Sequence, residues 1–389
     1  MGSELAMTRT LIVGAGAAGL TCAKHLRQLD ETRTITVLDK DPDVPYERPP
    51  LSKALSGAGS VSAGTDELKG AGIDVVFGTA VGVTVADQLL HTSGGDLGYD
   101  ELVLAPGSRP HRPSWVSEEV HALHSLDDSR RLRQAVSAAG SAVVIGGGFV
   151  GAELAASLVS AGVTTTFVFR EDALFRNRLG QAASDLLTRL HTEAGVRLIP
   201  NGTVADVQSG HPAQVHLTDG TTLHADLVVA GIGSHPDTAW LGDSGVLADD
   251  DTIRTDACLH TSAPGVAAAG DSVSWTGFDG SVMRSAHWTT ARSHGRHIAI
   301  DLAAGTRTPF LEPPYFWSMQ HGSLLQGIGH VDPQISEIEV LEGTGPKPGL
   351  LARYLIDGEL VGAVAINHPQ GFMAARADVE KHAASTLIR

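Results

Sequence analysis

Cysteine is nearly absent from this sequence, which has only Cys22 and Cys258 among its 389 residues. The two lie far apart and form no Cys-x-x-Cys pair, which excludes a disulfide-stabilised scaffold and a thiol redox pair. So little cysteine fits a reducing compartment, and we expect a cytoplasmic protein. Cys22 is expected to be a small buried hydrophobic residue.

Positive charge and long apolar runs are also scarce. Lys and Arg number 28 against 44 Asp and Glu, which gives a formal net charge of −16, and no cationic run occurs. Nucleic acids and anionic membranes are therefore not expected as partners. No apolar run approaches the length of a membrane span, and the early stretch TLIVGAGAAGL lacks the cleavage context of a signal peptide.

Glycine, in contrast, is abundant, and its 45 residues cluster at turns between expected strands and helices. The first cluster, Gly14-x-Gly16-x-x-Gly19, follows an apolar strand and opens a helix, and a second strand ends at Asp39. The first glycine allows the tight turn, the second lets a pyrophosphate approach, and the third lets helix and strand pack closely. Asp39 is placed to accept a ribose hydroxyl.

The same pattern recurs in SAVVIGGGFVGAEL, where Gly146, Gly148 and Gly151 open a second helix. Two such fingerprints predict two dinucleotides, and the economical pair is a flavin with a nicotinamide nucleotide that reduces it. Residues 99–110 and 225–236 each form an apolar strand that runs into glycine and proline, which indicates crossings between two nucleotide domains. The sequence therefore predicts a flavin-dependent oxidoreductase.

The segment YERPPLSK at residues 46–53 holds two cations, Arg48 and Lys53, on either side of a Pro-Pro pair. Proline fixes φ and favours extended geometry in the residue before it, so we expect a stiff excursion rather than a floppy loop. Such a segment would position its cations.

In their order, these motifs resemble the flavoprotein reductases with two dinucleotide-binding domains. TDACLHTSAPGVAAAGDSVSW at 255–275 is similar to that family's late flavin motif, with Asp271 at the position that grips the ribityl chain. YERPPLSK, PYFWSMQHGSLLQGIGH and the C-terminal LIDGELVGAVAINHPQGF resemble the oxygenase-coupled ferredoxin reductases, a branch that includes rubredoxin reductases and relatives of apoptosis-inducing factor. The resemblance covers residues 8–385, and the missing redox cysteines separate the chain from disulfide reductases.

This resemblance implies an α/β protein with two Rossmann-like domains and a C-terminal α/β cap. The FAD-binding domain would comprise 7–110 and 235–312, the NAD(P)H-binding domain 111–234 and the cap 313–389. Electrons would pass from NAD(P)H through FAD to a [2Fe-2S] ferredoxin or rubredoxin that feeds a haem monooxygenase or a Rieske dioxygenase. A monomer or homodimer is expected.

Three residues carry expected catalytic roles from the resemblance. Lys53 matches the lysine beside the flavin N5, where a cation stabilises reduced flavin. Glu153 matches a glutamate that pairs with this lysine at the nicotinamide pocket, and Trp317 an aromatic residue near the flavin face. Each has a plainer alternative: a solvated lysine, a first-turn glutamate favoured by the helix dipole, and a core tryptophan.

Two cofactor-binding sets follow. The residues expected at FAD are Gly14, Gly16, Ala17, Ala18, Gly19, Asp39, Lys40, Arg48, Lys53, Val81, Ala105, Gly107, Asp271, Trp288 and Trp317. Those expected at NAD(P)H are Gly146, Gly148, Phe149, Val150, Gly151, Glu153, Arg170, Arg176 and Gly233.

The residues at the end of the strand that follows the second fingerprint bear on whether the protein uses NADH or NADPH. NADH-selective relatives carry an acid where Phe169 stands here, whereas Arg170 could bind a 2′-phosphate, helped by Arg176. The sequence therefore favours NADPH, unless Glu171 takes the vacated role or the alignment slips by one residue.

Other positions depart from the family. Ala105-Pro106-Gly107 replaces the common Ala-Thr-Gly, Ala286 stands where a Glu is frequent and Met319 where an Asp is. The polar contacts that relatives make around the flavin from the positions of Ala286 and Met319 are therefore not expected here. No metal is expected: His287, His294 and His297 lie near one another in sequence, but no further ligand follows at zinc spacing.

Two other functions stay open: an NAD(P)H oxidase or reductase of quinones and other small acceptors, and a flavin-bound redox sensor. Because ferredoxins are usually acidic, a ferredoxin reductase needs a local basic surface. The candidates for that surface are Arg284, Arg292, Arg296 and Arg307.

Overall fold

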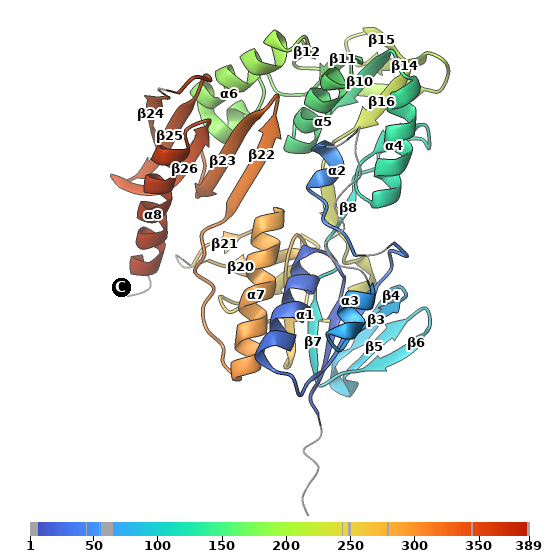
Figure 1. Cartoon of the computed structure of the whole chain (residues 1–389), viewed down its shortest axis with the longest axis vertical. Coiled ribbons are helices and arrows are strands. Elements are labelled where there is room, and N and C mark those ends of the chain that lie inside the picture. Colours follow the sequence, from blue (N-terminus) through green and yellow to red (C-terminus); the bar gives the residue numbers. More distant parts are fainter. Residues whose placement is uncertain are drawn as a thin grey trace, which may run out of the picture.

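The structure is a computed structural model. It describes residues 7–43, 45–53, 55, 65–242, 244–247, 250–277, 280–343 and 345–386, without the side chains of Lys53 and Thr386. Within this part of the chain, three five-stranded sheets organise the molecule (Figure 1). Two are parallel and one is antiparallel, which confirms the predicted α/β class with a C-terminal α/β unit.

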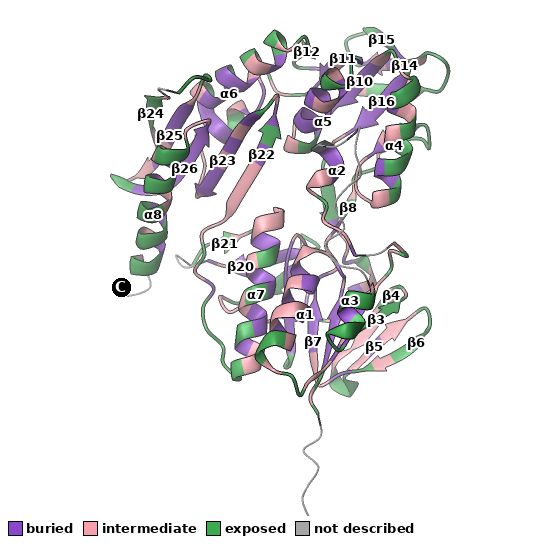
Figure 2. Cartoon of the chain, in the orientation of Figure 1, coloured by how far each residue is buried: buried purple, intermediate pink, exposed green. Residues whose placement is uncertain are grey.

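The first parallel sheet, in the lower part of Figure 1, has the strand order β19-β7-β1-β2-β3. Its strands are β1 (Arg9–Val13), β2 (Thr34–Asp39), β3 (Ile73–Phe77), β7 (Glu101–Leu104) and β19 (Val266–Ala268). The central strands are apolar because helices cover the sheet, and Figure 2 shows their residues as buried.

Two helices far apart in sequence lie side by side beside this sheet. They are α1 (Ala17–Leu29) and α7 (Trp288–Ala304), which ends at Gly305 in the left-handed conformation (φ 64°). A Cβ on Gly295 of α7 would come within 2.1 Å of the Ala18 carbonyl oxygen. Only glycine allows this approach, so α7 fixes the start of α1.

The second parallel sheet has the order β12-β11-β10-β16-β9. Its strands are β9 (Val120–Ala122), β10 (Ser141–Ile145), β11 (Thr164–Val168), β12 (Arg197–Ile199) and β16 (Leu227–Ala230). Its helices are α4 (Leu126–Ala138), α5 (Phe149–Ser160) and α6 (Arg176–Glu193). A capping box between Ser125 and Asp128 begins α4.

The two predicted crossings lie together as an antiparallel pair. Strand β8 (Ser108–Pro110) follows the first sheet, and β17 (Ser234–Pro236) follows the second. They pair in the register Ser108 with Pro236 and Pro110 with Ser234. The chain thus enters and leaves the second sheet through one narrow ladder.

The C-terminal sheet is antiparallel, with the order β22-β23-β26-β25-β24. Its elements are β22 (Tyr315–Gln320), β23 (Ser323–Gly329), β24 (Glu337–Glu342), β25 (Leu350–Ile356), β26 (Glu359–Ile366) and α8 (Pro369–Thr386). Strands β22 and β23 join through His321 and Gly322, both at positive φ (50° and 69°), which is typical of a two-residue hairpin turn.

Smaller elements complete the chain. They are the helices α2 (Pro50–Lys53) and α3 (Thr65–Gly70), the 3-10 turns Val85–Asp87 and Ala239–Leu241, and the strands β4 (Ala80–Thr84), β5 (Leu89–Thr92), β6 (Gly95–Gly98), β13 (Val204–Gln208), β14 (Ala213–Leu217), β15 (Thr222–Ala225), β18 (Ile253–Thr255), β20 (Val273–Thr276) and β21 (Val282–Met283). Among the described helices, none combines the length and apolar character that crossing a bilayer requires.

Candidate functional site

The first glycine fingerprint forms a strand–turn–helix cradle between β1 and α1. Gly14 turns at φ 101°, and a Cβ there would come within 2.1 Å of the Ala105 carbonyl oxygen. A Cβ on Gly19 would come within 1.9 Å of the Gly14 carbonyl oxygen, whereas one on Gly16 would meet nothing within 4 Å. The protein itself requires glycine at two positions, and the open space at Gly16 is what a closely approaching pyrophosphate needs. The cradle fits FAD.

The second fingerprint repeats this geometry between β10 and α5. Gly146 turns at φ 110°, and a Cβ there would come within 2.4 Å of the Gly231 carbonyl oxygen. Gly151 packs on the Gly146 carbonyl oxygen in the same way, at 2.0 Å. At Gly148 a Cβ would meet only the Gly231 oxygen, at 4.0 Å. This cradle fits a second dinucleotide, and Phe149 and Val150 begin its helix.

Strand register settles how the two units correspond. Val13 pairs with Leu38 in the first, so Asp39 is the next residue, and Ile145 pairs with Val168 in the second, so Phe169 is the next. By strand register, Asp39 and Phe169 are therefore equivalent positions of the two units. Asp39 accepts backbone hydrogen bonds from Ala15 (2.5 Å) and Asp41 (2.7 Å).

Phe169 is followed by charged residues that differ in how they could interact with a ribose. The Phe169 side chain is buried in the hydrophobic core and makes no polar contact. Arg170 is exposed, while Arg176 forms an ion pair with Asp172 at 2.8 Å. Glu171 is half-buried, and its Oε2 has no hydrogen-bond partner. Arg176 is thus already engaged, and Glu171 carries an unsatisfied acceptor.

The stiff segment 46–53 spans the first and second nucleotide units. The Tyr46 hydroxyl donates to Asp41 (2.8 Å) and accepts from the Leu126 amide (2.9 Å). Arg48 contacts the His124 ring nitrogen at 2.9 Å. Burial, and then the charge of Arg48, lower the pKa of His124 to about 4. The segment continues into α2, which ends at Lys53, whose side chain lies outside the described part of the structure.

Glu153 lies where three parts of the chain meet. It belongs to α5, is only 6% exposed, and accepts a hydrogen bond from Ser52 of α2 at 2.5 Å. From β22, the Ser318 hydroxyl donates at 2.7 Å and the Met319 amide at 3.2 Å. Met319 therefore contributes through its backbone, and the residue is 38% exposed. The predicted Glu153 and the helix of Lys53 are thus brought together, and Trp317 precedes Ser318 on β22.

A group of aromatic rings lies beside this carboxylate. Phe149 stacks on Phe175 (ring centroids 4.9 Å apart), and His287 stacks on Phe316 (5.1 Å). Phe149, His287 and Phe316 line a cavity of about 390 Å³. Burial, and then the charge of Arg178, lower the pKa of His287 to about 4, so its ring is neutral at physiological pH. Sequence reasoning identified Phe149, considered His287 only as a metal ligand, and missed Phe175 and Phe316.

The late flavin motif lies at the ladder between the units. Asp271 accepts a hydrogen bond from Ser108 of β8 at 3.3 Å. Burial raises the pKa of Asp271, and the positive charge of Arg48 partly offsets this. Arg48 and Asp271, both predicted to bind FAD, thus lie close enough for the charge of Arg48 to act on the Asp271 carboxyl.

The remaining predicted residues are more dispersed. Lys40 forms an ion pair with Asp237, and Trp288 begins α7 with the Arg292 guanidinium 4.6 Å above its ring. Val81, on β4, is 55% exposed and lies apart from the Glu153 junction. Gly107 and Gly233 turn at positive φ (70° and 97°) at the two crossings.

Two histidines of α7, His294 and His297, each make a hydrogen bond or close polar contact within the protein. The His294 Nδ1 accepts a hydrogen bond from the Gly270 amide at 3.3 Å, and the His297 Nε2 contacts the Thr308 carbonyl at 2.8 Å. In the described part of the chain, no cluster of three potential metal ligands occurs.

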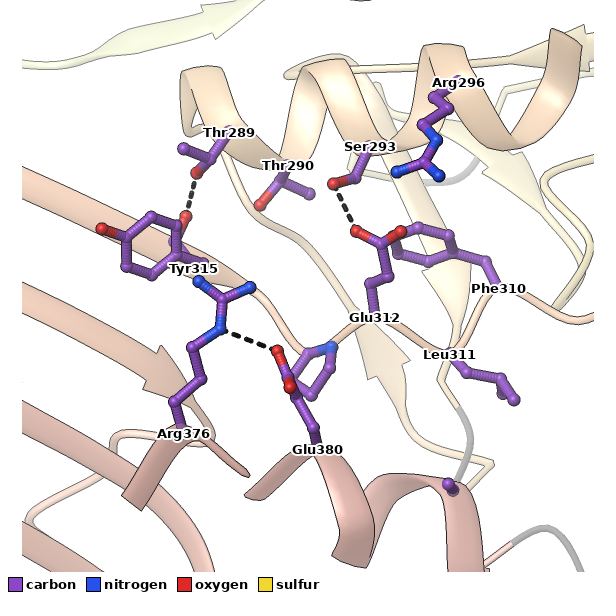
Figure 3. Close-up of a pocket in the computed structure, with 12 residues that line it drawn as sticks. Thr289, Thr290, Ser293, Arg296, Phe310, Leu311, Glu312, Tyr315, Arg376 and Glu380 are labelled. Carbon is purple, nitrogen blue, oxygen red and sulfur yellow. Dashed lines mark hydrogen bonds and ion pairs between the residues drawn. The ribbon is translucent and has the colours of Figure 1, made fainter. Parts of the chain in front are cut away.

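A second cleft, of about 460 Å³, lies between α7, residues 310–315 and α8 (Figure 3). Ser293 donates to Glu312 across it at 2.6 Å, and Arg376 pairs with Glu380 at 2.7 Å. The exposed Arg296 extends over its rim. This cleft is separate from the Glu153 junction.

Comparison with known proteins gives consistent matches. The family model described as pyridine nucleotide-disulphide oxidoreductase matches residues 8–295, and one described as reductase C-terminal matches residues 315–387. Terpredoxin reductase of Pseudomonas sp is 31% identical over 98% of this chain and 95% of its own length. The p-cumate 2,3-dioxygenase system ferredoxin–NAD(+) reductase component of Pseudomonas putida is 28% identical over 97% and 94%.

A solved structure agrees with these relatives. In the crystal structure of the covalent putidaredoxin reductase–putidaredoxin complex, the matching chain has a TM-score of 0.89 and 26% identity, covering 96% of this chain and 93% of that one. These similarities confirm the resemblance that the motifs indicated.

Proposed function

The chain belongs to the pyridine nucleotide-disulphide oxidoreductase family, and from that premise we propose that it passes electrons from a reduced nicotinamide nucleotide through FAD to a small iron–sulfur carrier protein. It is an FAD-dependent oxidoreductase, as the two fingerprints predicted. The two open cradles at Gly16 and Gly148 fit the two dinucleotides.

The observation that carries this proposal is the position of Glu153. This buried carboxylate belongs to the helix of the second cradle, yet its donors come from α2 and from the C-terminal sheet. Bound FAD would accept a hydride and release electrons singly. Glu153 and Lys53 would hold the nicotinamide end of the donor, while Phe149 and Phe316 exclude water from it.

We propose the domain division expected from the sequence, with FAD held by 7–110 and 235–312, the nicotinamide nucleotide by 111–234 and the cap formed by 313–389. The pairing of β8 with β17 supports boundaries at the ladder between the two parallel sheets. The cytoplasmic location and the choice between monomer and homodimer stay predictions.

For the electron donor we propose NADH. The NADPH preference expected from Arg170 and Arg176 is not supported by the names of the relatives, which include an NAD(+) reductase. Arg176 pairs with Asp172 at 2.8 Å and is therefore less available to a 2′-phosphate.

For the acceptor we propose a ferredoxin of an oxygenase system. The relatives include a terpredoxin reductase and a dioxygenase-system reductase. Of the four candidate arginines, Arg307 is paired with Asp256 at 2.8 Å. Arg292 and Arg296 are exposed and lie one turn apart on α7, and Arg296 lines the cleft of Figure 3. We therefore place the acidic carrier over this face.

Anaerobic stopped-flow reduction by NADH and by NADPH, followed by mixing with [2Fe-2S] ferredoxins, tests the proposal. We expect faster reduction by NADH, and reoxidation by at least one ferredoxin that exceeds reoxidation by oxygen. If oxygen or a quinone instead reoxidises the flavin faster than every ferredoxin, the protein is an oxidase or small-acceptor reductase.

A further inference from the structure

A continuous chain of hydrogen bonds connects Glu153 with two histidines. Ser318 Oγ contacts Glu153 at 2.7 Å, and Gln320 Nε2 contacts Ser318 Oγ at 3.2 Å. His191 Nε2 contacts Gln320 Oε1 at 3.1 Å, and His321 Nε2 contacts His191 Nδ1 at 3.0 Å. Ser318 and His191 are fully buried and Gln320 is 1% exposed, whereas His321 is half-buried.

The Gln320 amide fixes the direction of every bond. Its nitrogen only donates, so the Ser318 oxygen accepts from it and the Ser318 hydroxyl proton goes to Glu153. The Gln320 carbonyl then faces His191, whose Nε2 must carry the proton. His191 Nδ1 is left as an acceptor for the Nε2–H of His321. All four donors point toward Glu153.

We infer that His191, Gln320 and His321 are positioning residues that hold Ser318 as a donor to Glu153 and so fix this side chain for the nicotinamide end of the electron donor. Aligned hydrogen bonds polarise one another, which strengthens the last bond of such a chain. The role assigned to Glu153 rests on the proposed function, whereas the direction of the chain does not.

The two histidines come from different units of the fold. His191 lies in the last turn of α6, beside Phe167, and His321 forms the hairpin turn of the C-terminal sheet at positive φ. The chain therefore makes the position of Glu153 depend on how this hairpin docks against α6. Burial, and then the charge of His321, lower the pKa of His191 to about 4, so His191 is neutral at physiological pH.

The first test uses the FAD-loaded protein without nicotinamide. Side-chain ¹⁵N NMR, with signals assigned through His191→Gln and His321→Gln, should show both histidines as neutral Nε2–H tautomers. An Nδ1–H tautomer at His191 would reverse the chain and overturn the inference.

The second test uses Gln320→Glu, which keeps the volume but replaces the amide donor with an acceptor. We expect the limiting rate of reduction by NADH to fall about 3- to 10-fold, the loss of one ordinary hydrogen bond, with unchanged affinity for ADP-ribose, which lacks nicotinamide. His191→Leu should lower this rate to a similar extent. In His191→Gln, whose side chain can still donate and accept, the rate should stay within about twofold of the wild type.

Ser184→Ala is the matched control because Ser184 is buried on the same helix but lies outside the chain, and we expect no change. Wild-type rates in both Gln320→Glu and His191→Leu would overturn the inference. If neither nucleotide reduces the wild-type protein, the proposed function fails. The histidine tautomers alone then test the direction of the hydrogen-bond chain.

Discussion

Ser318 donates a hydrogen bond of 2.7 Å to Oε1 of Glu153 across 165 residues of sequence. This contact ties the C-terminal sheet to the helix of the second glycine fingerprint. Because Ser52 donates to the other carboxylate oxygen from the segment that leads to Lys53, Glu153 joins three parts of the fold. The predictions below begin from this junction.

Replacing Glu153 tests the junction directly. Glu153→Leu removes the acceptor for Ser52, Ser318 and the Met319 amide, so we expect a loss of about 2–4 kcal/mol in unfolding free energy. Glu153→Gln retains one carbonyl acceptor and should cost less. Thermal melting of the FAD-loaded proteins measures both. Glu193→Gln, at an exposed position of α6, is the charge-matched control and should melt like the wild type.

The two cradles should fail separately. Gly16→Ala adds a Cβ where the protein leaves open space, so the chain should fold but bind FAD at least about tenfold more weakly. Gly148→Ala should retain FAD and lose affinity for NADH, because the added methyl group occupies the open space of the second cradle and leaves the first cradle unchanged. Bound FAD is measured by absorbance and nucleotide affinity by titration. Loss of FAD in Gly148→Ala would contradict the assignment of the cradles.

Acid should destabilise the protein partly through His294. Burial, and then His297, lower the pKa of His294 from 6.5 to about 3. Below pH 6.5 the unfolded chain binds a proton that the folded protein does not, so stability falls with pH by up to about 1.4 kcal/mol per unit until the folded pKa is reached. The loss is complete only near pH 3.

His294→Gln keeps an acceptor for the Gly270 amide but does not titrate. With saturating FAD, its melting temperature should fall less steeply than that of the wild type between pH 6.5 and pH 5. His224→Gln replaces an exposed histidine of β15 and should preserve the wild-type slope. Parallel curves for His294→Gln and the wild type would show that His294 does not carry this dependence.

Charge reversal on α7 tests the docking face. In Arg292→Glu/Arg296→Glu we expect reduction by NADH to stay normal, while electron transfer to ferredoxin slows about tenfold at low salt and by less at high salt. Stopped-flow mixing at two salt concentrations measures this. Arg197→Glu alters an exposed arginine of β12 in the second sheet and serves as the control. An equal loss in both variants would argue against a specific surface.

The sequence predicted the parts of the fold that depend on local patterns. Each glycine fingerprint lies between an apolar strand and a helix that begins within three residues, so residues close in sequence determine the turn, the helix start and the position of Asp39. The register of β11 then supported the placement of Phe169 that the sequence had suggested.

The partners of Glu153 had no such local signal. Ser52, Ser318 and Met319 are ordinary residues in sequence, and they meet Glu153 only after the second sheet and the C-terminal unit have packed. Phe316 and His287 likewise form their stacked pair across different elements. Long-range packing determines these contacts, so sequence patterns identified the carboxylate but not what holds it.

The discontinuous first sheet has a consequence for synthesis of the chain. Strand β19 completes the first sheet, and helix α7 contacts α1 through Gly295. Both elements follow the entire second sheet in sequence. During synthesis the second nucleotide unit is therefore complete while the first, proposed for FAD, still lacks an edge strand and its neighbouring helix. We expect the flavin to be acquired only after residue 304 has emerged, so a nascent chain can contain its second nucleotide unit before its first can close.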